Sequence, residues 1–107
     1  MAEVLTNIEE LRGRIDVVDD QLLRLLNVRV ACAVEVGRLK HEAGLPVYQP
    51  EREAQVLNKV RAKAAELAGP LTADAVIRIF ERIIDEARRA ERAPSGRGEG
   101  TAPSPEA

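Results

Sequence analysis

A single arginine interrupts an otherwise apolar stripe in the first forty residues of the chain. Apolar residues recur there at alternating spacings of three and four, which is typical of a heptad seam between packed helices. The seam comprises Ile8, Leu11, Ile15, Val18, Leu22, Leu25, Arg29, Cys32, Val36 and Leu39. A guanidinium cannot lose its charge, so an arginine buried in this seam needs an anion beside it. That anion is either a carboxylate of the protein or a bound ligand.

Other charged residues fall on the apolar faces or at the starts of the predicted helices and can join Arg29: Arg12, Lys40, Arg52, Glu53 and Glu91. Lys40 follows Arg29 by eleven residues, which is about three helical turns and about 16 Å along the axis, on nearly the same face. The two can therefore grip opposite ends of one small molecule. The whole set has four cations and two carboxylates. Because each uncompensated buried charge costs several kcal/mol, this excess favours a binding site for a dianionic ligand.

Each of these residues also has a purely structural interpretation. Arg29 can form an ion pair with one of three aspartates, Asp16, Asp19 or Asp20, and thereby fix the register of the helices. Lys40 and Arg52 lie near helix ends, where a long cationic side chain commonly reaches solvent. Glu53 can complement the positive start of its helix, and Glu91 can lie at a frayed helix end. The prediction of a ligand site therefore depends on the set as a whole.

The composition limits the class of protein. With 107 residues and a net charge of -2, the chain has room for one small domain and no basic excess for nucleic acid. A hydrophobic fraction of 45% with 2% aromatic residues favours helices over a sheet. Glu3, Glu9 and Glu10 interrupt any apolar signal or membrane segment, so we expect a soluble cytoplasmic protein. Cys32 and His41 lack partners at metal-ligand spacing, and we expect a small packing residue and a surface histidine.

The turn-forming residues predict three helices and a tail. The first helix runs from about Glu3 to Glu42 and ends at the sequence AGLP, where a glycine can cap it and a proline cannot continue it. The second begins within VYQPEREA, with Pro50 near its first position, and fades near Leu67. Thr72 caps the third, which ends near Arg92. We therefore expect one domain over residues 1–92 and a flexible tail over 93–107, which has no apolar side chain larger than alanine.

The length of the first helix predicts an oligomer. A helix of about 40 residues is about 60 Å long, whereas a compact domain of about 100 residues has a radius of gyration of about 13 Å. We expect the second and third helices to line one side of it end to end, and a second copy of the chain to cover the rest. If two first helices pair antiparallel about Leu22, Arg12 of one chain lies opposite Cys32 of the other. A shared cationic site between Arg29 and Lys40 would result.

Four segments carry a resemblance to a known family: LRGRIDVVDDQLLRLLNVR, AVEVGRLK, PVYQPEREAQVL and IFERIIDEAR. In this order and spacing they resemble the all-helical chorismate mutase family, over about Ile8 to Arg92. The resemblance implies an all-α, three-helix chain that forms an intertwined homodimer with two active sites. It also implies conversion of chorismate to prephenate in phenylalanine and tyrosine biosynthesis, with no cofactor and no metal.

The resemblance also implies roles for the charged residues. Arg29, Arg52 and the partner subunit's Arg12 surround the two carboxylates of the substrate. Lys40 reaches a carboxylate and the ether oxygen of the breaking bond, and Glu53 holds the ring hydroxyl. We expect catalysis to depend on Lys40, Arg29 and Glu91, because the negative charge that develops on the ether oxygen must be stabilised.

Three positions depart from the commonest pattern of the family. Gln49 takes the place of a frequent acidic residue near the hydroxyl, and Ala87 replaces a small hydroxyl residue that often contacts a carboxylate. Ala87 cannot donate a side-chain hydrogen bond, so it occupies the position of the hydroxyl residue without making its contact. Glu91 stands where many members have glutamine. It can donate to the ether oxygen only when protonated, so we expect faster turnover at mildly acidic pH.

Two other functions fit the same residues. An isochorismate pyruvate lyase would use the same scaffold and nearly the same cations. A noncatalytic dimerisation or regulatory module of a larger shikimate-pathway enzyme is the alternative from another class, as a fusion or complex. Such a module would have lost cationic positions, whereas all four are present here.

Overall fold

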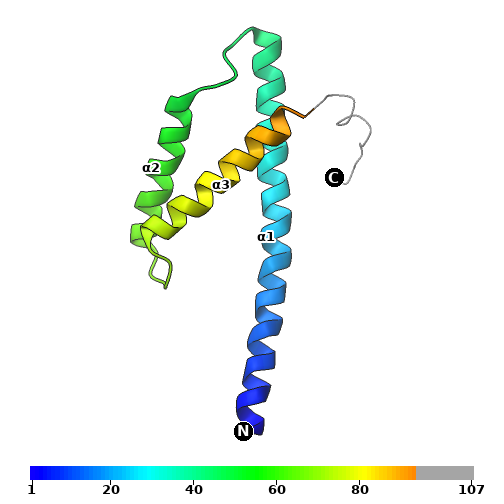
Figure 1. The fold of residues 1–107 in the computed structure, drawn as a ribbon, viewed down its shortest axis with the longest axis vertical. Coiled ribbons are helices and arrows are strands. Elements are labelled where there is room, and N and C mark those ends of the chain that lie inside the picture. Colours follow the sequence, from blue (N-terminus) through cyan, green and yellow to red (C-terminus); the bar gives the residue numbers. More distant parts are fainter. Residues whose placement is uncertain (94–107) are drawn as a thin grey trace.

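The protein is built from three helices, as seen in a computed structural model that describes residues 1–93 (Figure 1). They are α1 (Ala2–Ala43), α2 (Pro50–Glu66) and α3 (Ala73–Glu91), and no strand occurs among residues 1–93. The predicted all-α architecture of one long and two shorter helices is therefore confirmed. Residues 94–107, which make up nearly all of the predicted flexible tail, lie outside the described range. Within that range no helix is both long and apolar enough to cross a membrane.

The end of α1 is set by Gly44. This residue adopts the left-handed conformation, with φ 70° and ψ 24°, and its N–H donates to the carbonyl of His41 at 3.2 Å. The N–H of Leu45 then donates to the carbonyl of Lys40 at 2.8 Å. These bonds satisfy carbonyls that the helix would otherwise leave unpaired, and glycine takes the required φ without a steric penalty. The chain changes direction at this point and continues into α2.

The starts of the shorter helices also follow from local chemistry. Pro50 is the first residue of α2, where its missing N–H costs no helical hydrogen bond. Glu51 and Glu53 follow in the first turn, near the positive end of the helix dipole. The hydroxyl oxygen of Thr72 accepts from the N–H of Ala75 at 3.1 Å and caps α3. The predicted boundaries are therefore confirmed to within a residue or two.

The packing of the helices differs from the expected arrangement. We predicted that α2 and α3 would line α1 end to end. Instead α2 and α3 form a hairpin, and α3 crosses from the far end of α2 to the C-terminal half of α1 (Figure 1). Among the described residues α3 packs against both other helices, while α1 and α2 do not pack directly against each other. The short connection through Gly69 and Pro70 reverses the chain, so α3 runs back along α2.

The N-terminal half of α1 projects beyond the other two helices (Figure 1). The chain measures 62 × 34 × 15 Å, and its radius of gyration is 18.1 Å. The seam of α1 is therefore exposed in the single chain, with Leu11, Ile15, Leu22 and Leu25 each at least half exposed. Apolar surface on this helix is thus left uncovered by α2 and α3.

Candidate active site

A cavity of about 760 Å³ lies between the C-terminal half of α1, the start of α2 and the end of α3. Each helix contributes residues at spacings of three and four, which is one face of each helix. The α1 face consists of Arg29, Cys32, Ala33, Val36 and Lys40. The α2 face, with the residue before it, consists of Gln49, Arg52, Glu53 and Val56. The α3 face consists of Ile84, Ala87, Arg88 and Glu91. The volume suits a small molecule.

Lys40 joins α1 to the loop that leads into α2. Its ammonium donates to the carbonyl of Val47 at 3.3 Å, and the side chain is half-buried. An ammonium has three N–H donors, so two remain for a ligand. The same contact holds the loop near the cavity, and Gln49 lines the wall two residues further on.

The end of α3 closes the cavity against α1. Ala87 is the only buried residue within 1–93, at 4% exposure, because α3 packs closely there. Glu91 lies one turn further along and approaches Gly37 of α1. A methyl group added to Gly37 would lie 3.6 Å from Oε1 of Glu91, which is ordinary contact distance. The Glu91 carboxylate is therefore half-buried between two helices and faces the cavity.

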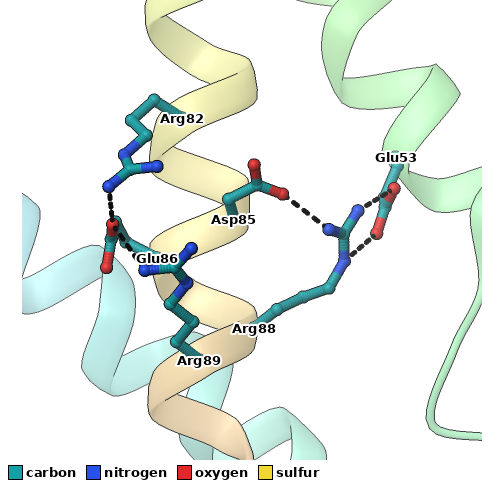
Figure 2. A network of polar contacts seen from close by, with 6 residues as sticks. All are labelled: Glu53, Arg82, Asp85, Glu86, Arg88 and Arg89. Atoms are coloured by element: carbon teal, nitrogen blue, oxygen red, sulfur yellow. Dashed lines mark hydrogen bonds and ion pairs between the residues drawn. The ribbon is translucent and has the colours of Figure 1, made fainter.

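Arg88 makes the principal polar contact between α2 and α3 at this site. Its Nε donates to Glu53 Oε2 at 2.9 Å and its Nη2 donates to Glu53 Oε1 at 2.5 Å. Nη1 donates to Asp85 Oδ1 at 2.7 Å, one turn back on α3. Figure 2 shows Arg88 reaching across to α2, while Arg82, Glu86 and Arg89 form a separate cluster on another side of α3. The hydrogen bond to Glu53 raises the pKa of Arg88 above its ordinary value, so its charge is secure.

The charges at the cavity are unbalanced. Five cationic side chains line it, Arg29, Lys40, Arg52, Arg88 and Arg92, against the carboxylates Glu53 and Glu91. Arg88 already neutralises Glu53. Within residues 1–93 no carboxylate oxygen lies within 4.0 Å of Arg29, Lys40 or Arg52. The structural alternative for Arg29, an ion pair with an aspartate of its own chain, is therefore not found there.

The structure brings together seven of the eight residues predicted for the site: Arg29, Lys40, Gln49, Arg52, Glu53, Ala87 and Glu91. Arg12 does not line this cavity. It lies in the projecting half of α1 and contacts Glu9 at 3.6 Å, with its side chain 70% exposed. Seventeen residues separate it from Arg29, about 26 Å along the helix, so it cannot reach the cavity of its own chain.

Two residues at the cavity differ from the expectation. Cys32 was expected to be a small packing residue, and in the single chain it is exposed at the cavity wall. Arg88 was missed altogether. Extending the stripe of Ile84 and Ala87 by one helical position would have placed it on the same face. His41 is exposed as expected, and no cluster of potential metal ligands occurs in the described part of the chain.

A family model, longer relatives and solved structures indicate one family. A family model described as "Chorismate mutase type II" matches residues 11–92. The bifunctional chorismate mutase/prephenate dehydratase of Aquifex aeolicus is 36% identical over 81 residues, which are 75% of this chain and 22% of that protein. The T-protein of Haemophilus influenzae is 38% identical over 79 residues, 74% of this chain and 20% of that protein. The chain therefore spans about a fifth of these longer relatives.

Shorter relatives match over most of their length. The chorismate mutase of Methanocaldococcus jannaschii is 28% identical over 82 residues, which cover 77% of this chain and 81% of that protein. The solved structure of chorismate mutase (form II) from Thermus thermophilus superimposes with a TM-score of 0.74 at 34% identity. The superposition covers 81% of this chain and 96% of that one.

Proposed function

Because this chain belongs to the type II chorismate mutase family, we propose that it converts chorismate to prephenate at the cavity between its three helices. The observation that carries the proposal is a group of three cations on the wall of one cavity that have no carboxylate partner within residues 1–93: Arg29, Lys40 and Arg52. Chorismate carries two carboxylates, and this group supplies the opposite charge. The site is therefore suited to a dianion of this size.

The proposed reaction needs no nucleophile, because it is an intramolecular rearrangement in which a carbon–oxygen bond breaks as a carbon–carbon bond forms. The protein must hold a flexible substrate in a compact conformer and stabilise the negative charge that grows on the ether oxygen. In this proposal Arg29 and Arg52 bind the carboxylates. Lys40 donates to the ether oxygen and to a carboxylate, since two of its N–H groups are not used by Val47.

The remaining residues of the cavity complete the proposed contacts. Glu53 accepts a hydrogen bond from the ring hydroxyl, with Gln49 beside it. Glu91, in its protonated form, donates to the ether oxygen from the side of α3, since an ionised carboxylate only accepts. Ala87 forms part of the wall and contributes shape alone.

We propose that the working unit is a homodimer. Two copies of α1, paired antiparallel about Leu22, would cover the exposed seam, which includes Leu11, Ile15 and Leu25. This pairing would bring the partner's Arg12 opposite Cys32, a residue of the cavity wall. The projecting half of α1 supports the proposal, because neither α2 nor α3 packs against it (Figure 1). The site would then gain a further cation for a substrate carboxylate.

The proposed setting is aromatic amino acid biosynthesis in the cytoplasm. Relatives such as the Aquifex aeolicus protein are named as bifunctional mutase and dehydratase enzymes. A complex or fusion with another enzyme of this pathway is therefore part of the proposal.

The deciding experiment is an absorbance assay of chorismate disappearance with the purified protein, followed by identification of the product. Prephenate is the expected product, and loss of turnover in Lys40→Ala should accompany it. Isochorismate should be offered in parallel as a separate substrate. Release of pyruvate from isochorismate without prephenate from chorismate would contradict the proposal, as would no turnover of either compound.

A further inference from the structure

Arg88 connects α2 and α3 through an ion pair that is less exposed than the others in the described part of the chain. The side chains of Arg88 and Glu53 are 35% and 27% exposed. The second ion pair between these helices, Arg61 with Asp74, has side chains 53% and 74% exposed and lies outside the cavity wall. Partial burial reduces solvent screening, so the Arg88 pair is the stronger of the two. Its place on the cavity wall connects it to the site.

We propose that Arg88 is a positioning residue that holds the carboxylate of Glu53 in the orientation needed to accept the ring hydroxyl of the substrate. This inference rests on the proposed function and deepens it. An ionised carboxylate has about four lone-pair sites, and Arg88 occupies one on each oxygen. One site on each oxygen remains for a substrate hydroxyl. The fork of two hydrogen bonds fixes the plane of the carboxylate as well as its place.

Asp85 supports this geometry from α3. It accepts from Nη1 of Arg88 at 2.7 Å, so three nitrogens of the guanidinium are engaged at once. The side chain of Arg88 is therefore held from its own helix and from α2 together. Lysine in its place would keep the charge but not the planar fork.

The pair has a second effect on the charges at the cavity. Glu53 follows Arg52 in sequence, and Lys40 lines the same cavity. Without Arg88, the Glu53 carboxylate would be a half-buried anion on a wall whose other cations are Arg29, Lys40, Arg52 and Arg92. It would then compete with the carboxylates of the substrate for these cations. Arg88 thus keeps the substrate-binding cations available while it orients Glu53.

The test is a double-mutant cycle on chorismate turnover with wild type, Arg88→Leu, Glu53→Gln and the double variant. The hydroxyl does not react, so its contact is the same in substrate and transition state, and its loss should appear in KM. We expect Arg88→Leu to raise KM about tenfold or more, the loss typical of one hydrogen bond to a charged group, with kcat changed by less than about threefold. In the Glu53→Gln background Arg88→Leu should add less than about twofold.

Two further variants separate positioning from support of the fold. Arg61→Leu removes the other ion pair between α2 and α3 and should leave KM unchanged. Arg88→Lys should recover only part of the KM loss, because it lacks the fork. Thermal melts of all variants check that they fold. A KM for Arg88→Leu equal to wild type would refute the inference, and so would an equal loss in the Glu53→Gln background, which would mean that Arg88 does not act through Glu53.

A readout independent of turnover distinguishes this inference from the proposed function. The Nε–H signal of Arg88 in ¹⁵N NMR should be protected from exchange in the wild type and lose that protection in Glu53→Leu, whose side chain has no acceptor. Protection that survives in Glu53→Leu would overturn the ion pair itself. Absence of chorismate turnover by the wild-type protein, with the NMR result as expected, would instead refute the proposed function and the assigned substrate hydroxyl.

Discussion

Replacing Lys40 with alanine removes the ammonium group of the cavity wall, which donates a hydrogen bond to a backbone carbonyl. Its bond to the carbonyl of Val47 leaves two N–H groups for a ligand. The interaction energy of two opposite unit charges about 4 Å apart is about 4 kcal/mol at an effective dielectric constant of about 20. The ether oxygen carries only part of a charge in the transition state, and loss of one such donor typically costs about 3 kcal/mol. At about 1.4 kcal/mol per tenfold, kcat/KM should fall by more than about a hundredfold.

The same substitution should have little effect on folding. Lys40 lies in the last turn of α1, where a cation stabilises the helix end by about 0.3–1 kcal/mol. Its hydrogen bond to Val47 is exposed and long, at 3.3 Å, and adds at most about 1 kcal/mol. The free energy of unfolding should therefore fall by less than about 2 kcal/mol, measured by urea denaturation. Lys63→Ala, at an exposed position in the last turn of α2, is the matched control and should keep wild-type turnover. Near-normal kcat/KM in Lys40→Ala, or an equal loss in Lys63→Ala, would refute the assignment.

Three further predictions address the acid, the shared site and the surface of α1. Glu91→Gln should turn over chorismate at least as fast as the wild type at about pH 7, because an amide donates a hydrogen bond at every pH whereas a carboxyl donates only when protonated; slower turnover by Glu91→Gln would contradict this. A mixture of Arg12→Ala and Arg29→Ala proteins should regain part of the lost activity after subunit exchange, because every heterodimer carries one intact site; no recovery after verified exchange would argue against a shared site. The hydrogen bond from Arg38 holds the pKa of the Glu35 carboxyl below its ordinary value of 4.5, so the ionised pair stabilises α1 above that pH and the effect is lost on acidification. Glu35→Gln should therefore lower the melting temperature more at about pH 7 than at about pH 3, and an equal decrease at both would refute the linkage.

The site was predicted from the sequence to the extent that charged residues interrupt apolar faces. Arg29 and Lys40 lie on one face of α1 however the other helices cross it, because helical periodicity alone determines which residues share a face. Glu53 and Glu91 were placed inward by the same rule, and both line the cavity. The spacing of the motifs, through their resemblance to a family, indicated which of these residues belong together.

The contact between Glu53 and Arg88 was not predicted, because the two residues are 35 positions apart and lie on different helices. Whether they meet depends on how α3 crosses α2. That crossing follows from the packing of many side chains, which no short pattern encodes. The same reason explains the error about α2 and α3, which form a hairpin instead of lining α1 end to end.

The sequence by itself determined the three helices and their ends, because Gly44, Pro50 and Thr72 act on hydrogen bonds within a few residues of themselves. It also determined the surplus of positive charge, since arginine stays charged in any fold. Only the tertiary structure decided that Arg29 has no aspartate partner within the described residues and that Glu53 is paired with Arg88. These outcomes depend on distances of a few ångströms between helices, and such distances follow from the packing of the whole domain.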